Sequence, residues 1–348
     1  MNPYVLMILL SSLGLGTTLT FASSHWLLAW MGLEINTLAI LPLMAQQHHP
    51  RAVEATTKYF LTQATAAAMI MFAATTNAWV TGEWDINNLT HPLTSSLTIT
   101  ALALKVGLAP MHFWMPEVLQ GLDLTTGLIL STWQKLAPFA LIIQMAPNTN
   151  PALLTALGLT STLIGGWGGL NQTQLRKILA YSSIAHMGWM IIILQYTPQL
   201  TLMALTLYIF MTSTAFLSLK MASATKINTL TATWSKSPVL TVTTALALLS
   251  LGGLPPLTGF MPKWLILQEL TKQDLPTTAT IMAMAALLSL YFYLRLCYAM
   301  TLTISPNTTN ATTPWRINTT QSTLALALMS TAALGLLPLT PTILALLT

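Results

Sequence analysis

Two stretches of sequence decide the fold: Gly107-Leu-Ala-Pro-Met-His-Phe-Trp-Met-Pro-Glu117 and Gly253-Leu-Pro-Pro-Leu-Thr-Gly-Phe-Met-Pro-Lys263. They align without a gap, and five of the eleven positions are identical. Each lies in an apolar segment too long for one membrane crossing, and its prolines disrupt helix hydrogen bonds that lipid cannot replace. Each stretch therefore predicts a broken helix whose free backbone groups are satisfied by buried protein or by water. Proline kinks that only shape a helical bundle are the alternative.

The composition around these stretches is that of a membrane protein. Of 348 residues, 54% are hydrophobic and 6% are charged, whereas about a quarter are charged in an ordinary globular protein. Mean hydropathy is +0.66, and no basic cluster favours nucleic acid as a partner. These values exclude a soluble protein, a disordered chain and a nucleic-acid-binding protein.

Apolar windows of about 20 residues recur between short polar breaks, and each is long enough to cross a bilayer. The first begins at Met1 without a basic region or a cleavage site, which predicts a retained helix and not a signal peptide. The fold class predicted is an all-α polytopic membrane protein with eleven transmembrane helices. The predicted spans are 3–22, 26–45, 56–79, 95–121, 125–146, 151–170, 175–195, 200–219, 237–271, 276–302 and 323–346.

The two matching stretches fall in the fourth and ninth spans, five helices apart. The same motif must then cross the membrane in opposite directions, as in an inverted-topology repeat. Paired broken helices in two such halves point to a transport site.

Basic residues in the loops predict the orientation, because Lys and Arg stay on the cytoplasmic-equivalent side. The loops on the side of the N-terminus hold eight of them, the opposite loops only Lys272, and Arg295 is expected to extend to the same basic surface. The N-terminus is therefore predicted inside and the C-terminus outside. The eight residues are Arg51, Lys58, Arg176, Lys177, Lys220, Lys226, Lys236 and Arg316.

Four ionisable residues lie within predicted spans: Glu34, Lys105, Lys135 and Lys263. A charge at the bilayer centre costs about 2.5–3.5 kcal/mol, so each predicts a functional group facing a partly hydrated bundle interior, with Glu34 and Lys105 as an ion pair. Burial disfavours the charged form of an ammonium and a nearby carboxylate favours it, which suits proton transfer. Structural pairing between helices is the alternative.

His112, in the first break, and His186, in the seventh span, are candidate proton relays, since histidine titrates near physiological pH. A histidine held by one backbone hydrogen bond is the alternative for each. Cys297 is the single cysteine, which excludes an intramolecular disulfide and an iron–sulfur or zinc cluster held by thiolates of this chain.

Three segments resemble one known family. Leu175-Arg-Lys-Ile-Leu-Ala-Tyr-Ser-Ser-Ile-Ala-His-Met-Gly188 is similar to the hallmark segment of the antiporter-like subunits of respiratory complex I and their Mrp-type relatives. The segments Glu34-Ile-Asn-Thr-Leu-Ala-Ile-Leu-Pro-Leu-Met44 and Gly252-Gly-Leu-Pro-Pro-Leu-Thr-Gly-Phe-Met-Pro-Lys-Trp264 narrow the resemblance to its animal mitochondrial branch. The similarity runs over essentially the whole chain.

The resemblance implies a core of fourteen helices with two inverted five-helix repeats, of which the animal branch lacks the first three helices. The chain would divide into a first repeat at 1–146, a second at 151–302, and a loop with a final helix at 303–348. By motif position, Glu34, Lys105, Lys135 and Lys263 match the family's charged residues, and His112 and His186 match positions along its hydrated axis.

The resemblance further implies a subunit of NADH:ubiquinone reductase that translocates protons while other subunits carry electrons, flavin (FMN) and iron–sulfur clusters. No cofactor is expected in this chain. The expected location is the mitochondrial inner membrane, with the N-terminus in the matrix and the C-terminus in the intermembrane space. Expected partners are other membrane-arm subunits, including neighbouring antiporter-like ones, and membrane lipids, with cardiolipin at Arg176 and Lys177 as a hypothesis.

Three other functions are weighed against this one. A stand-alone cation/proton antiporter would share the broken helices and buried lysines. A purely structural scaffold of the membrane arm would tolerate loss of Lys105 and Lys263. A redox subunit is disfavoured because cofactor ligands are absent from the sequence.

Overall fold

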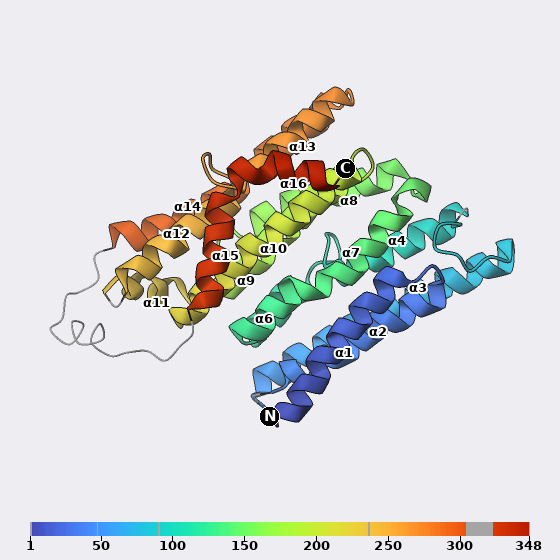
Figure 1. Cartoon of the computed structure of the whole chain (residues 1–348), viewed down its shortest axis with the longest axis horizontal. Helices are drawn as coiled ribbons and strands as arrows, with labels where there is room; N and C mark the ends of the chain where they lie inside the picture. Colours follow the sequence, from blue (N-terminus) through green and yellow to red (C-terminus); the bar gives the residue numbers. More distant parts are fainter. Residues whose placement is uncertain (1, 47, 90, 236, 304–322, 348) are drawn as a thin grey trace. The chain divides into compact units, whose positions relative to one another are not determined.

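The computed structural model describes residues 2–46, 48–89, 91–235, 237–303 and 323–347 (Figure 1). In this part of the chain every extended regular element is a helix, and no strand is formed. Two isolated bridges pair His25 with Asp85 and Gln174 with Lys226. The predicted all-α class is confirmed. Lys236 and Arg316, used above for the orientation, lie outside the described residues.

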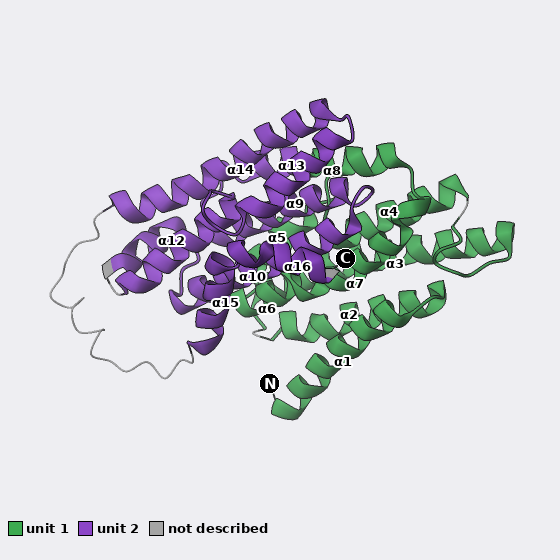
Figure 2. Cartoon of the chain, turned by 45° about the horizontal axis from the view of Figure 1, so that its top comes forward, with its two compact units in different colours: residues 1–161 green, residues 162–348 purple. Residues whose placement is uncertain are grey.

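The chain forms two compact units, residues 1–161 and 162–348, coloured separately in Figure 2. Helix α8 (Pro151–Gly168) contributes to both. The other helices of unit 1 are α1 (Pro3–Ala22), α2 (Trp26–Met44), α3 (Pro50–Thr81), α4 (Pro92–Val106), α5 (Trp114–Gly121), α6 (Leu124–Ser131), α7 (Trp133–Met145) and the 3-10 turn η1 (Ala146–Asn148).

Unit 2 is also helical throughout its described residues. Its elements are α9 (Leu175–Ile193), α10 (Pro198–Met221), α11 (Ile227–Thr231), η2 (Ala232–Ser235), α12 (Pro238–Gly252), α13 (Phe260–Lys272), α14 (Pro276–Leu302), α15 (Leu324–Gly335), η5 (Leu337–Leu339) and α16 (Thr340–Leu347).

Local sequence sets where many helices begin. Proline stands at the start of seven of them, where its missing N–H costs nothing and its fixed φ suits the helix. These prolines are Pro3, Pro50, Pro92, Pro151, Pro198, Pro238 and Pro276. Asn2, His25 and His49 add side-chain caps by accepting hydrogen bonds from backbone N–H groups of the first turns of α1, α2 and α3.

In unit 1, α1 packs on α2, and α3 packs on α2, α4 and α5. The α1–α2 contact is close because glycines face each other: a β-carbon at Gly16 would lie 2.9 Å from the Gly32 carbonyl oxygen, and one at Gly32 equally near that of Gly16. In unit 2, α10 packs on α9, α12 and α15, and α12 packs on α14. Small residues at helix crossings are typical of membrane bundles.

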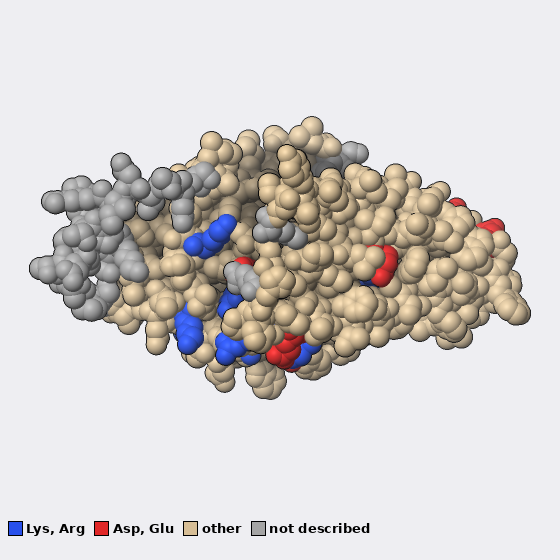
Figure 3. Space-filling view, turned by 90° about the horizontal axis from the view of Figure 1, so that it is seen from below, with Lys and Arg blue, Asp and Glu red and all other residues tan. Residues whose placement is uncertain are grey.

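Five helical segments are each long and apolar enough to cross a membrane: α1, α2, Leu124–Asn148, α10 and α14. Helices α15 and α16, bent by 64°, would together make a sixth. On the face shown in Figure 3, Lys, Arg, Asp and Glu occupy few positions. The chain is a membrane protein, and the count of eleven spans stays a prediction.

The span predicted at 125–146 corresponds to the segment Leu124–Asn148, which is long and apolar enough to cross a membrane. Within it, Thr132, with φ of −112° and ψ of −68°, separates α6 from α7. The guanidinium of Arg295 donates to the carbonyls of Leu170 and Gln172, just after α8, in the loop that leads to Arg176 and Lys177 at the start of α9.

Candidate functional site

The first break follows a left-handed glycine at the end of α4. Gly107 has φ +85°, and the N–H groups of Gly107 and Leu108 both donate to the Ala103 carbonyl at 2.9 Å. Glycine suits this position because it has no β-carbon to clash. Pro110, after a cis bond, prevents the helix from resuming at once, and α5 begins at Trp114.

The second break has the same local structure. Gly253 has φ +80°, and the N–H groups of Gly253 and Leu254 both donate to the Leu249 carbonyl, at 3.1 and 3.3 Å. A cis bond precedes Pro256, the residue aligned with Pro110. The predicted discontinuity of both helices is confirmed.

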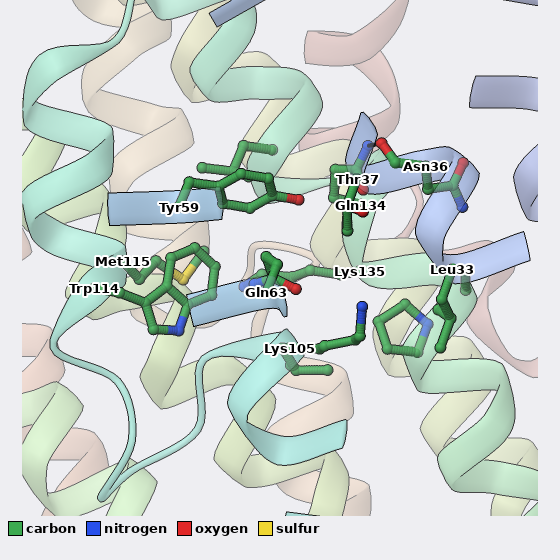
Figure 4. Close-up of a pocket in the computed structure, with 14 residues that line it drawn as sticks. Leu33, Asn36, Thr37, Tyr59, Gln63, Lys105, Trp114, Met115, Gln134 and Lys135 are labelled. Atoms are coloured by element: carbon green, nitrogen blue, oxygen red, sulfur yellow. Dashed lines mark hydrogen bonds between the residues drawn. The ribbon is translucent and has the colours of Figure 1, made fainter. Parts of the chain in front are cut away.

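Lys105 and Lys135 line one small cavity in unit 1 (Figure 4). Lys105 lies in the last turn of α4 and is 6% exposed, and Lys135 on α7 is 2% exposed. The C-terminal end of α4 carries partial negative charge, which favours an ammonium there. The cavity has a volume of about 20 Å³, enough for one water molecule.

Polar side chains that the sequence analysis did not single out share this cavity. Tyr59 and Gln63 come from α3, Gln134 precedes Lys135, and Asn36 and Thr37 come from α2. The Nζ of Lys105 and the Nε2 of Gln63 are buried and have no hydrogen-bond partner among the described residues. Two of these cavity residues could have been predicted together from the sequence, because Tyr59 and Gln63 are four residues apart and so lie on one face of α3.

Glu34 lies on α2 near Lys105 and interacts with it electrostatically, but it is not among the residues lining the cavity. No ion pair within 4.0 Å joins them, and the buried Oε2 of Glu34 has no hydrogen-bond partner among the described residues. The predicted Glu34–Lys105 ion pair is therefore wrong in this structure. A shared depth in the membrane does not fix the separation of two side chains, which depends on how their helices dock.

His112 is buried beside the first break. Its Nδ1 lies 3.3 Å from the Pro110 carbonyl oxygen, and its ring centroid lies 4.4 Å from that of Phe113. It is not among the residues lining the Lys105 cavity.

In unit 2, Lys263 is half-buried on α13, and its Nζ donates to the Gly252 carbonyl at 2.7 Å. His186 is half-buried on α9, with its ring centroid 5.7 Å from that of Tyr208 on α10. The structure thus brings Lys105 and Lys135 to one cavity of unit 1, and it gives Lys263 a backbone partner at the second break.

Within the described ranges, no three His, Cys, Asp or Glu side chains are grouped so that they could hold a metal ion. Cys297 on α14 is buried, and its Sγ lies 3.7 Å from the Ala245 carbonyl oxygen. At the Lys105 cavity, the lysine amines can gain and lose protons, and the neighbouring amide side chains can donate to and accept hydrogen bonds from water.

Comparisons with known proteins agree over the whole chain. The family described as NADH:quinone oxidoreductase/Mrp antiporter matches residues 23–289, and the NADH dehydrogenase subunit 2 C-terminus matches residues 290–344. NADH-ubiquinone oxidoreductase chain 2 of Formosania lacustris is 91% identical over 99% of both chains, and that of Carassius auratus is 81% identical over 100% of both. A chain of respiratory complex I from Thermus thermophilus, solved with bound aureothin, has a TM-score of 0.88 and 29% identity, covering 100% of this chain and 81% of that one.

Proposed function

Since the chain belongs to the NADH:quinone oxidoreductase/Mrp antiporter family, and within it to the NADH-ubiquinone oxidoreductase chain 2 proteins, we propose that it translocates protons in the membrane arm of complex I. Electron transfer from NADH to ubiquinone takes place in other subunits, which hold the flavin and iron–sulfur clusters. This chain then supplies protonatable groups and no redox centre.

The observation that carries the proposal is the cavity shared by Lys105 and Lys135. Two buried amines beside a helix break, with amide and hydroxyl groups and room for water, form a short path for a proton. Burial disfavours the charged form of each lysine, and the nearby Glu34 carboxylate favours the charged form of Lys105. A movement of α2 or α4 that changes the distance from Glu34 to Lys105 would therefore change which lysine holds the proton. One pKa unit corresponds to about 1.4 kcal/mol, and moving a charge against 100 mV costs about 2.3 kcal/mol. A change of a few pKa units in a lysine therefore suffices to drive a proton against the membrane potential.

The architecture proposed is eleven spans in two inverted repeats, 1–146 and 151–302, followed by 303–348. The matched breaks at Gly107 and Gly253 support it, because each ends an apolar helix with the same hydrogen bonds. Lys263 is the charged group proposed for the second repeat, and His112 and His186 are the proposed relays.

The location proposed is the mitochondrial inner membrane, with the N-terminus in the matrix and the C-terminus in the intermembrane space. Eight basic loop residues on one side against one on the other support this orientation. Neighbouring membrane-arm subunits are the proposed partners. Cardiolipin is proposed to bind at Arg176 and Lys177, and retained lipid binding after both are neutralised would contradict that site.

The test is the number of protons pumped per NADH oxidised in membranes carrying Lys105→Met, with assembly checked on a native gel. Lys272→Met is the matched control, because Lys272 is exposed at the end of α13. We expect the ratio to collapse for Lys105→Met alone. An unchanged ratio in an assembled complex would favour the structural scaffold, and ion/proton exchange by the isolated chain would favour the stand-alone antiporter.

A further inference from the structure

Helix α5, the second half of the first broken span, is tied to α3 by a charged contact outside the cavity. The Nζ of Lys58 on α3 lies 2.8 Å from Oε2 of Glu117 on α5, and 2.7 Å from Oε1 of Glu54, one turn earlier on α3. Lys58 and Glu117 are 42% and 54% exposed. Ion pairs this exposed contribute little to folding stability.

The far end of α5 is fixed to the same helix by close backbone packing. A β-carbon at Gly121 would lie 2.6 Å from both the Cβ of Ala55 and the carbonyl oxygen of Arg51. Only glycine lets the end of α5 approach the first turns of α3 this closely.

The near end of α5 forms a wall of the Lys105 cavity. Trp114 and Met115 line the cavity, and the Trp114 indole N–H donates to the Leu104 carbonyl at 3.0 Å. The Trp114 ring also packs on Tyr59, which follows Lys58 on α3, with centroids 5.7 Å apart. Tyr59 directly follows Lys58 on α3, and Met115 lies two residues before Glu117 on α5. Both line the cavity, so a shift of α5 against α3 changes its shape.

At the second break, the residue aligned with Glu117 makes a different contact. Lys263 stands at the position aligned with Glu117, and its ammonium reaches back across the break to the Gly252 carbonyl of α12. Glu117 has the opposite charge, so it would repel a helix C-terminus and turns instead to Lys58 on a third helix. The residue at this aligned position therefore links α13 to α12 at the second break, and it links α5 to α3 at the first break.

We propose that Lys58 and Glu117 are positioning residues for proton transfer: their ion pair holds α5 against α3 so that the wall beside Lys105 and Lys135 keeps its shape. The proposal rests on the proposed function of that cavity. It requires the pair for coupled pumping and not for folding or assembly.

The experiment compares protons pumped per NADH oxidised in membranes carrying Glu117→Gln, Lys58→Gln and the double charge reversal Lys58→Glu with Glu117→Lys. We expect each single variant to assemble and to lower the ratio below that of the unaltered complex, because each removes the charged contact between α3 and α5. The reversal restores an opposite-charge pair between α3 and α5, so we expect it to recover most of the ratio. A loss that does not depend on the pairing of these two charges would show no such recovery.

Glu54→Gln is the matched control, because it removes the other carboxylate of Lys58 and leaves the contact with α5. Its ratio should equal that of the unaltered complex. An unchanged ratio in Glu117→Gln, an equal loss in Glu54→Gln, no recovery on charge reversal, or failure of both single variants to assemble would each overturn the proposal. Lys105→Met in the same series separates the two ideas: if it lowers the ratio while Glu117→Gln does not, only the positioning role fails.

Discussion

The ammonium of Lys263 reaches the carbonyl of Gly252, eleven residues earlier, across a break in its own helix. That carbonyl belongs to the last residue of α12, where no intrahelical donor is available. The Lys263 ammonium, which is costly to place in a membrane, therefore donates a hydrogen bond to a carbonyl that would otherwise have no donor at the end of α12. The same side chain covers Gly253, where a β-carbon would lie 2.8 Å from Cδ and 2.9 Å from Nζ of Lys263.

Replacing Lys263 by methionine should destabilise the second break. The Gly252 carbonyl loses its donor, and a buried carbonyl left unpaired costs about 1–3 kcal/mol. We expect a lower dissociation temperature of the assembled complex for Lys263→Met than for Lys272→Met, whose lysine is exposed. Equal temperatures for the two variants would show that the Lys263–Gly252 bond adds no stability.

Comparing Gly253→Ala with Gly82→Ala separates the stability cost of a left-handed backbone from the cost of a clash with a neighbouring side chain. Both glycines are left-handed, with φ of +80° and +75°, and a β-carbon costs about 1–2 kcal/mol there. A β-carbon at Gly82 meets nothing within 4 Å, whereas one at Gly253 meets Lys263. We expect Gly253→Ala to lower the thermal stability of the complex more than Gly82→Ala does, and the Lys263→Met background should reduce that difference.

A similar pair tests the contact between α1 and α2. A β-carbon at Gly16 would lie 2.5 Å from the Oδ1 of Asn36, and one at Gly14 on the same helix meets nothing within 4 Å. Overpacking typically costs about 1–3 kcal/mol, so Gly16→Ala should reduce the yield of assembled complex on a native gel. Gly14→Ala should assemble normally, and a loss of yield as large as that of Gly16→Ala would contradict the close-packing argument.

Acid should weaken the charged contact on α3. The Lys58 ammonium, which hydrogen bonds with the Glu54 carboxylate, lowers the pKa of that carboxyl below its ordinary value of 4.5. A carboxyl whose pKa is lower when folded contributes stability above the unfolded pKa, and that contribution disappears as pH falls through the folded pKa.

The measurement is the dissociation temperature of the complex against pH, for the unaltered chain and for Glu54→Gln. Because the Lys58–Glu54 pair is exposed, we expect only a small constant difference between the two curves at neutral pH, and convergence as pH falls below the ordinary carboxyl value of 4.5. A difference that persists in acid would mean that the Glu54 charge does not stabilise the fold.

The sequence by itself determined the features that depend on neighbouring residues along the chain. Gly107 and Gly253 with their following prolines end α4 and α12 because left-handed backbone and missing donors act locally. Proline at helix starts acts in the same way. The buried lysines were identifiable because a charge inside an apolar window is visible without any structure.

Only the tertiary structure decided which side chains meet. It gave Lys105 and Lys135 one cavity with Tyr59 and Gln63, and it kept Glu34 from pairing with Lys105. It also turned Glu117 toward α3, although the aligned Lys263 turns toward α12. Helical periodicity fixes which residues share a face, but the approach of one face to another depends on packing summed over whole helices, which sequence spacing does not contain.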